Sequence, residues 1–290
     1  MALASERLSD ARVVIVGLGL MGGSLAGALR GQCRSVVGVA RRAEAIDSAL
    51  ARGLIDRGTT DLPAALSEAD IVVLATPVRT ILRQLAEIGP LLAPGCLLLD
   101  LGSTKAQIVV QMADLPAHVE PLGGHPMCGK EVSGLQAADP ALYRDTTFIL
   151  CPLPRTSEDA LALGRELARA VGAQPLVLEA ERQDFLVGTV SHLPYLLACT
   201  LVSTADALTS PDPAAWEIVA GGFRDTSRVA GSEVTMMLDI LMTNRVEVSK
   251  TVRTFRAQLD ALAGLIEAGD EEALRTTLTR IRNIRLEMFP

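Results

Sequence analysis

Several residue types and patterns are scarce in this 290-residue sequence, and each scarcity excludes a class of function. Aromatic residues make up 3%, no basic tract occurs and the formal net charge is −7, so a nucleic-acid-binding surface is not expected. No continuous apolar run reaches the ~18 residues of a membrane span, and the N-terminus MALASERLSDAR lacks the apolar core of a signal peptide. We therefore expect a cytoplasmic protein that binds neither nucleic acid nor a membrane.

The cysteines and histidines also restrict the chemistry that the protein can perform. The five cysteines show no C-x-x-C spacing, so free thiols are expected and no metal site is predicted. The only histidines are His118, His125 and His192, which leaves few candidates for a catalytic base. A hydrophobic content of 49% with 21% charged residues is typical of a globular chain, and the length of 290 residues suggests one large or two medium domains.

The most informative pattern is the stretch 12–31, which reads RVVIVGLGLMGGSLAGALRG. The apolar residues Val13–Val16 predict a buried strand, and apolar residues at helical spacing beyond the glycines predict a helix. A G-x-G-x-x-G sequence in this context predicts dinucleotide binding. Gly17 permits the tight turn, Gly19 lets the backbone approach a pyrophosphate, and Gly22 lets the helix pack on the strand. The alternative is a glycine-rich turn without a ligand.

The end of the next predicted strand, Ser35–Val39, indicates which dinucleotide binds. NAD enzymes usually place an acid about 20 residues beyond the glycines, for the ribose 2′-hydroxyl. Here Ala40 is followed by Arg41 and Arg42, whose guanidinium groups suit a 2′-phosphate. NADP is therefore the expected cofactor and NAD the alternative, unless the two arginines are only solvated. The expected cofactor-binding residues are Gly17, Gly19, Leu20, Met21, Gly22, Arg41, Arg42, Thr76 and Pro77.

Alternating strands and helices define the fold class. Strands are expected at 13–16, 35–39, 55–59, 69–75, 95–101, 119–122, 146–150 and 174–178, and helices at 43–52, 62–67, 78–88 and 157–171. Continuous apolar strands in this alternation predict a Rossmann-type doubly wound parallel sheet covered on both faces. Beyond Glu179 only helical spacing appears, so we expect a Rossmann domain at 1–178 and a helical domain at 179–290.

Two strand ends carry polar residues suited to chemistry, because open sheets of this type bind ligands at the carboxyl ends of their strands. Ser103 follows the strand at 95–101 and opens a predicted helix, where it is either an N-cap or a site residue. His125 follows Gly123 and Gly124, which bring the backbone close and direct the imidazole into the crevice. We take His125 as the candidate catalytic residue; the alternative is a surface or core histidine.

A seam of apolar residues runs through the C-terminal part, with steps of four and three residues. It consists of Val248, Val252, Phe255, Leu259, Leu262 and Ile266. Such heptad-like spacing suits packing between helices, either within the chain or across a dimer interface.

The segments GLGLMGGSLA, DLGSTK, GGHPMCGKEVSG, SHLPY and GGFRDTSRVA together resemble the prephenate/arogenate dehydrogenase family of tyrosine biosynthesis, over nearly the whole chain. The resemblance implies NAD(P)-dependent oxidative decarboxylation of a cyclohexadienol carboxylate to a phenol. It also implies a homodimer joined through the C-terminal helical domain.

The same resemblance assigns roles to single residues. His125 matches the family's catalytic histidine and Ser103 the serine beside it. Arg228 matches the arginine that grips the ring carboxylate, His192 matches a histidine near the substrate, and Lys130 is grouped with them as substrate-binding. Cys128 departs from the family, which often carries alanine there, and is expected to be a small apolar substitute. No regulatory domain is expected after Pro290.

Three alternatives stay open at this stage. Prephenate is the expected substrate, but arogenate, or use of both, fits the same residues. A dehydrogenase of the 3-hydroxy acid type would need a helical G-x-x-x-K-x-x-x-N, and none of the three lysines is followed four residues later by asparagine. A non-enzymatic NADP-sensing module would keep the glycines but would not need His125 and Arg228 together.

Overall fold

The computed structural model describes residues 3, 7–210, 212 and 214–288 of the chain. It comprises two compact units, Met1–Arg245 and Val246–Pro290, which are described separately. These units are compact parts of the folded chain, whereas the boundary expected at residue 179 separates strand-forming from helical sequence. The boundary at 178/179 therefore stays a prediction.

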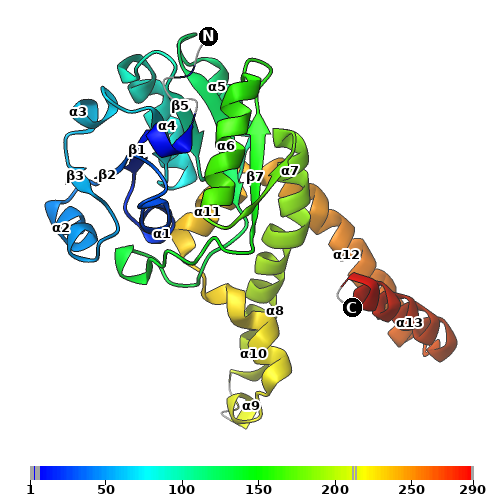
Figure 1. Cartoon of the computed structure of the whole chain (residues 1–290). Helices are drawn as coiled ribbons and strands as arrows, with labels where there is room; N and C mark the ends of the chain where they lie inside the picture. The colour runs from blue at the N-terminus through cyan, green and yellow to red at the C-terminus, as the bar shows by residue number, and fades with distance from the viewer. Residues whose placement is uncertain (1–2, 4–6, 211, 213, 289–290) are drawn as a thin grey trace. The chain divides into compact units, whose positions relative to one another are not determined.

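The first unit contains an eight-stranded sheet with the strand order β3-β2-β1-β4-β5-β6-β7-β8 (Figure 1). Its strands are β1 (Arg12–Val16), β2 (Ser35–Val39), β3 (Arg57–Thr59), β4 (Ile71–Leu74), β5 (Leu97–Asp100), β6 (Glu120–Pro126), β7 (Thr147–Pro152) and β8 (Gln174–Val177). The chain reverses its winding at β1, where β2 lies on one side and β4 on the other. The doubly wound architecture is confirmed, with one difference: β7 runs antiparallel to β6.

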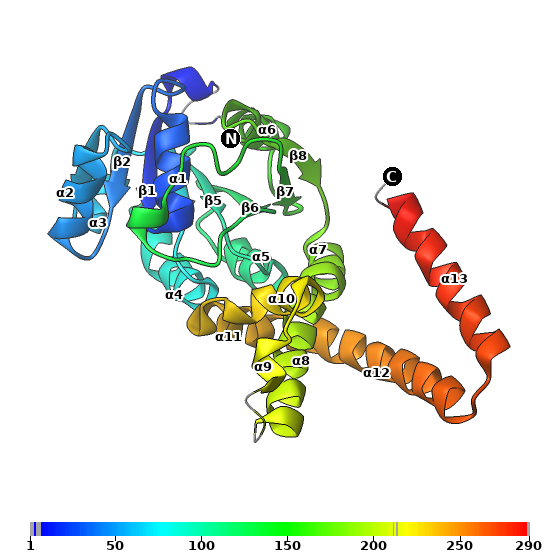
Figure 2. The same cartoon turned by 90° about the horizontal axis from the view of Figure 1, so that it is seen from below.

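Helices cover both faces of the sheet because its central strands are buried throughout. The helices are α1 (Leu20–Leu29), α2 (Ala43–Ala51), α3 (Leu62–Leu66), α4 (Val78–Ile88), α5 (Ala106–Ala113) and α6 (Glu158–Ala170). Figure 2 shows α1 and α6 on one side of the strands and α4 and α5 on the other. Two apolar clusters follow from this arrangement, one under α1 and α6 and one under α4 and α5. The predicted strands and helices are all present; most are shorter by one or two residues at their ends, whereas β6 and β7 extend beyond their predicted ends to Pro126 and Pro152.

Helices alone follow the sheet in the described part of the chain, as expected. They are α7 (Ala180–Val187), the π-helical turn η4 (Gly188–His192), α8 (Leu193–Thr209), α9 (Ala214–Glu217), α10 (Gly221–Ser227), the 3-10 turn η5 (Arg228–Gly231) and α11 (Val234–Thr243). Both α10 and η5 pack against α8 (Figure 2), and α11 packs against α4.

The continuous helical run Ala180–Thr209 is more apolar than the expectation from continuous apolar runs suggested, and the expectation that the protein binds no membrane stays a prediction. By length and composition it could cross a membrane, with a mean hydropathy of 1.7 over its best 18-residue window. This run contains no continuous apolar stretch of ~18 residues, because uncharged polar residues such as Thr189, Ser191 and Thr200 interrupt the apolar ones. Only 22% of that window is buried within the unit. Since an apolar helix needs an apolar environment, this run has surface left to be covered.

The second unit is formed by α12 (Arg245–Glu267), except for its first residue, and by α13 (Glu271–Met288). Many of its large apolar side chains are exposed, among them Leu259, Ile266, Leu278, Ile281, Ile284 and Leu286. In the predicted seam Val248 is buried, Val252, Phe255 and Leu262 are half-buried, and Leu259 and Ile266 are exposed. Two helices with so little core of their own need a further partner for their apolar faces.

Candidate active site

The turn between β1 and α1 has the geometry of a phosphate-binding loop. Gly17 has φ +105° and donates its N–H to the Val39 carbonyl at 2.9 Å. A Cβ on Gly22 would lie 1.9 Å from the Gly17 carbonyl oxygen, so only glycine fits there. A Cβ on Gly19 would meet nothing within 4 Å, so this position faces open space. The pyrophosphate of a dinucleotide would fit above Gly19, where the first N–H groups of α1 are free of intrahelical partners.

The other expected cofactor residues lie at neighbouring strand ends. Arg41 and Arg42 follow β2 and are both exposed. Thr76 and Pro77 follow β4, where the Thr76 hydroxyl donates to the Gln84 side-chain oxygen at 2.6 Å and Pro77 precedes α4. The sheet therefore brings these residues and the glycine turn to the same edge.

A fully buried ion pair joins the ends of β5 and β6. The Asp100 carboxylate accepts hydrogen bonds from the Gly102 N–H at 2.7 Å, from the Gly124 N–H at 3.1 Å and from the Lys105 ammonium group. Both side chains are inaccessible to solvent. Burial raises the pKa of Asp100, and Lys105 acts in the opposite direction. The pair fixes the loop that carries Ser103 relative to the strand that carries His125.

Ser103 is not an N-cap, which corrects one of its two expected roles. Helix α5 begins only at Ala106, and its N-cap residue is Lys105. The free N–H groups of Lys105 and Ala106 donate instead to the Asp184 carboxylate of α7, at 2.6 and 3.0 Å. A carboxylate from another helix replaces the local cap, so Ser103 is released from capping and lies half-buried at the strand end.

His125 lies inside β6 rather than after it, and it is 8% exposed. A Cβ on Gly124 would lie 2.5 Å from the Asp100 carbonyl oxygen, so the close approach of β6 to β5 requires this glycine. The Gln183 side-chain Nε2 lies 2.6 Å from His125 Nδ1 and 3.3 Å from the Ser103 carbonyl oxygen. Burial, together with the charges of Lys105 and His192, lowers the pKa of His125 to about 3. The imidazole is therefore neutral at physiological pH.

His192 lies in the same buried group of side chains. It ends the π-helical turn η4, a rare element that is frequent at functional sites. The Asn244 side-chain Nδ2 lies 3.2 Å from His192 Nδ1 and donates to the Asp184 carbonyl oxygen at 2.7 Å. Burial lowers the pKa of His192 to about 4. Asn244 links His192 to Asp184, and the neighbouring Gln183 contacts His125, so α7 connects the two expected histidines.

Arg228 and Lys130 are placed differently from the histidines. The Arg228 guanidinium pairs with the Glu131 carboxylate, and Lys130 pairs with Asp139 at 3.1 Å. The Arg228 side chain is 61% exposed. We call these two exposed ion pairs the accessible rim; neither cation has a hydrogen bond to His125 or Ser103 among the contacts of the described residues.

The thiol of Cys128 is half-buried, and burial raises its pKa to about 11. A thiol that stays protonated is a poor nucleophile, which agrees with its expected role as a small apolar residue.

Four residues that organise the site were not predicted from the sequence: Asp100, Gln183, Asp184 and Asn244. Asp100 stands inside the DLGSTK segment, so a buried acid at a strand end was an available signal. Gln183 and Asp184 lie two helical turns before SHLPY on the same helical run, which could have placed them near His192. No sequence pattern marks Asn244 as a site residue, since it joins the cluster through tertiary contacts alone.

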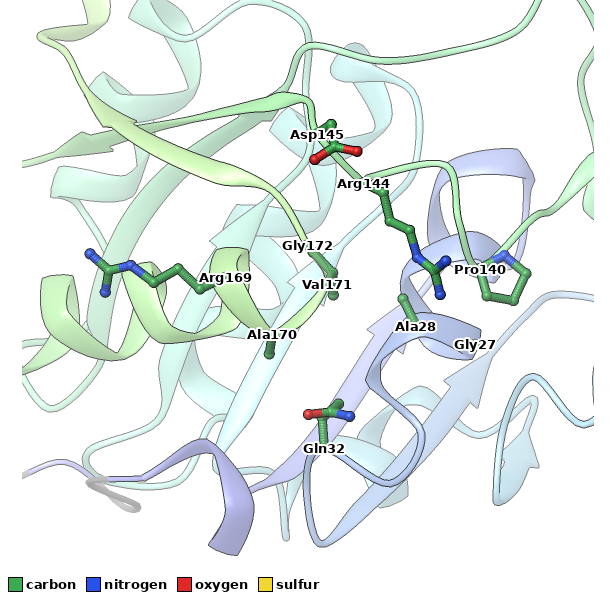
Figure 3. Close-up of a pocket in the computed structure, with 10 residues that line it drawn as sticks. All are labelled: Gly27, Ala28, Gln32, Pro140, Arg144, Asp145, Arg169, Ala170, Val171 and Gly172. Carbon is green, nitrogen blue, oxygen red and sulfur yellow. The ribbon is translucent and has the colours of Figure 1, made fainter.

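A separate depression of about 430 Å³ lies between the ends of α1 and α6 (Figure 3). Its lining includes Gly27, Gln32, Arg144 and Arg169. The helix α1 runs back from the carboxyl end of β1, so this depression is at the opposite edge of the sheet from the glycine turn. Figure 3 shows Arg144 and Arg169 extending in different directions, so the depression lacks convergent charged groups and is not part of the site.

Known proteins resemble this chain over nearly all of its length. The family model described as "Prephenate dehydrogenase, nucleotide-binding domain" matches residues 25–177, and the one described as "Prephenate dehydrogenase, dimerization domain" matches residues 179–280. A prephenate dehydrogenase of Lactococcus lactis subsp. cremoris is 34% identical over 281 residues, which cover 96% of this chain and 77% of that protein.

Two solved structures have the same fold throughout. One is prephenate dehydrogenase from Aquifex aeolicus in complex with hydroxyphenyl propionate and NAD+, with a TM-score of 0.90, 33% identity and coverage of 97% of this chain and 99% of that one. Arogenate dehydrogenase from Synechocystis has a TM-score of 0.84, 29% identity and coverage of 96% and 99%. With the glycine turn and the buried histidine cluster at one edge of the sheet, the chain belongs to the prephenate dehydrogenase family of nicotinamide-dependent oxidoreductases.

Proposed function

We propose that this protein catalyses the NADP-dependent oxidative decarboxylation of prephenate to 4-hydroxyphenylpyruvate. The observation that carries the proposal is the buried, neutral imidazole of His125, held at the strand ends beside Ser103. NADP would bind on the Gly17–Gly22 turn and, when bound, would accept a hydride from C4 of the substrate ring.

The residues of the chain would carry the proton and the carboxylate. His125 accepts the proton of the C4 hydroxyl, which a neutral imidazole in a buried site can do. Ser103 holds the hydroxyl or the imidazole in line. Arg228 binds the ring carboxylate by its fork of donors, and the loss of CO2 then makes the ring aromatic. His192 and Lys130 complete the substrate-binding group.

Arogenate is the second candidate, and one contact favours it. The Glu131 carboxylate pairs with Arg228 on the accessible rim. A carboxylate there could bind the side-chain ammonium of arogenate, a group that prephenate lacks and that is costly to bury unpaired. Prephenate stays the first candidate because Arg228 already neutralises this acid.

The preference for NADP rests on the position of Arg41 and Arg42. Both follow β2, are exposed and have no acidic residue beside them in the sequence. A 2′-phosphate would gain charge-assisted hydrogen bonds there, whereas a 2′-hydroxyl would lack the usual carboxylate acceptor.

Steady-state kinetics with both substrates and both cofactors test the proposal, with NADPH absorbance as the signal. We expect kcat/KM to be highest for prephenate with NADP+, and Arg41→Asp to shift the preference toward NAD+. Equal kcat/KM for the two cofactors would overturn the cofactor assignment. A value for arogenate more than about tenfold above that for prephenate, or about 1.4 kcal/mol, would overturn the substrate assignment. Binding of NADP+ without turnover of either compound would indicate a sensor.

The apolar surface of the helices supports a homodimer, and the free cysteines support a cytoplasmic location. The helical run Ala180–Thr209 and the second unit expose large apolar side chains, which a second copy would cover. All five cysteines are free thiols, the state kept in a reducing compartment. Light scattering at micromolar concentration should give the mass of a dimer, and a monomer would contradict this assignment.

A further inference from the structure

One polar atom beside the catalytic candidates has no hydrogen-bond partner. The Gln183 side chain is fully buried in α7, with its Nε2 in contact with His125 Nδ1 and the Ser103 carbonyl. Its other terminal atom, Oε1, has no hydrogen-bond partner in the described part of the chain. An unpaired buried carbonyl oxygen is costly, so this atom needs an explanation.

The orientation of this amide determines where the proton of His125 lies. An amide nitrogen only donates, so Gln183 Nε2 donates to His125 Nδ1, and Nδ1 must be unprotonated. The neutral ring then carries its proton on the opposite nitrogen, Nε2. A ring in that form donates toward a substrate hydroxyl and cannot take its proton.

Half a turn of the amide about its Cγ–Cδ bond reverses this situation. The oxygen then takes the place of the nitrogen, 2.6 Å from His125 Nδ1, and accepts a hydrogen bond from Nδ1–H. The lone pair of His125 Nε2 becomes free to accept a proton. The turn gives up a 3.3 Å bond to the Ser103 carbonyl and moves the amide N–H groups to the place where Oε1 has no partner, and it gains a bond to a ring that becomes positively charged. Hydrogen bonds to charged groups are the stronger ones, so the turned form is favoured once the ring is protonated.

We propose that Gln183 is a positioning residue that selects the tautomer of His125, with Oε1 turned toward Nδ1–H whenever His125 acts as the base. This inference rests on the proposed role of His125. The proton leaves the C4 hydroxyl oxygen and bonds to His125 Nε2, while the hydride from C4 goes to the bound nicotinamide cofactor. Before this step one proton moves from Nε2 to Nδ1 by exchange with water, without net change.

The charges around His125 disfavour its protonated form, so a neutral hydrogen-bond acceptor beside Nδ1–H would help the ring to take a proton. The titratable and charged groups in this cluster are Asp100, Lys105, Cys151, Glu181, Asp184 and His192. Of these, Lys105 and His192 act on His125 and both disfavour its protonated form. Asp100 and Asp184 are engaged by Lys105 and by the N-terminus of α5. In the turned form the oxygen of Gln183 takes the place of the nitrogen beside Nδ1 and stabilises the imidazolium.

Kinetics of two variants test this role. Gln183→Leu removes the acceptor, so kcat should fall roughly 10–100-fold, the effect of losing a hydrogen bond to a charged group, with little change in KM. Gln183→Glu supplies a permanent acceptor that raises the pKa of the imidazole, so the acid limb of the kcat–pH profile should move to higher pH. Gln111→Leu is the matched control, because Gln111 donates to the Leu82 carbonyl at 2.6 Å, away from His125. A fall in kcat no larger than in the control, with an unmoved profile, would overturn the proposal.

A second measurement reads the tautomer without turnover. With three histidines in the sequence, ¹⁵N NMR of labelled histidine can be assigned by the His125→Asn variant. Nδ1 should be protonated in wild-type protein with NADP+ and 4-hydroxyphenylpyruvate, and in Gln183→Glu without ligands. If Nδ1 is unprotonated in Gln183→Glu, the proposal is wrong even when the enzyme is active. If wild-type protein turns over neither substrate while this tautomer is found, the proposed function is wrong and the positioning role stands.

Discussion

Two regions at the same edge of the sheet prepare the site by different physical means. The turn after β1 presents backbone, and its requirements are steric: a φ of +105° at Gly17, no room for a Cβ at Gly22 and open space above Gly19. The cluster at the ends of β5 and β6 presents buried side chains. It depends on pairing, because Asp100, Lys105 and Gln183 are fully buried.

The two regions should therefore respond differently to substitutions and to pH. A backbone turn responds to added volume and is indifferent to protonation. A buried polar cluster responds to the loss of a single partner, since an unpaired buried charge costs about 3–5 kcal/mol, and to pH. Substitutions in the turn should therefore act on cofactor binding, and substitutions in the cluster on catalysis and on pH dependence.

The largest effect is expected from His125→Asn, which removes the proposed base from the cluster. The value of kcat should fall by roughly 10²–10⁴-fold, the usual contribution of acid–base catalysis, while cofactor affinity changes little. Kinetics and NADP+ titration measure the two quantities separately. His118→Asn is the matched control, since His118 contacts the Leu92 carbonyl and not the cluster. Activity within a few-fold of wild type in His125→Asn would mean that another group is the base.

The next effect concerns the accessible rim, which belongs to neither region. Arg228→Ala should raise KM roughly 10–100-fold with a smaller change in kcat, because the guanidinium binds the carboxylate in the ground state and the transition state alike. Arg224→Ala, one turn earlier in α10, is the control. An unchanged KM would place Arg228 outside the substrate site.

These two regions also differ in how far the sequence predicts them. The turn is local: strand, glycines and helix follow one another within 20 residues, so the spacing of Gly17, Gly19 and Gly22 was enough. The central parallel strands β1, β4 and β5 were predicted for the same reason, since each contains a short continuous apolar run. The antiparallel course of β7 was not, because its pairing depends on a long connection after β6.

The cluster is assembled from segments far apart in the chain, and local patterns describe it poorly. Ser103 looked like an N-cap because it precedes a helix, but Asp184, 81 positions later, takes over the capping of α5. Gln183 and Asn244 looked like ordinary helical polar residues, and only tertiary contacts bring them to the histidines. The family resemblance supplied His192 and Arg228, which no spacing argument had singled out.

A smaller effect tests the steric character of the turn. Gly19→Ala meets no atom within 4 Å and a φ of −101° suits alanine, so the protein should fold with unchanged thermal stability. The methyl group would still occupy the space of the pyrophosphate, and affinity for NADP+ should fall at least about tenfold, or about 1.4 kcal/mol.

Two further glycine variants sharpen this test. Gly264→Ala in α12, also in open space, is the control that should leave cofactor binding intact. Gly22→Ala should lower stability by about 1–3 kcal/mol, because its Cβ would overlap the Gly17 carbonyl. Full affinity for NADP+ in Gly19→Ala would show that the cofactor does not lie above this residue.

The smallest expected effect tests the pH sensitivity of the cluster through stability. The folded pKa of His125 is about 3, whereas an unfolded histidine titrates near 6.5. Between these values the unfolded chain binds the extra proton, so the contribution of His125 is present above pH 6.5 and is lost as the pH falls toward 3. At pH 5.5 the loss is about 1.4 kcal/mol for one such histidine. Urea unfolding at pH 8 and pH 5.5 should show a drop in stability that is smaller by this amount in His125→Asn than in wild-type protein. An identical drop in both would mean that His125 is not held neutral in the folded cluster, and the contrast with the backbone turn would then be one of geometry alone.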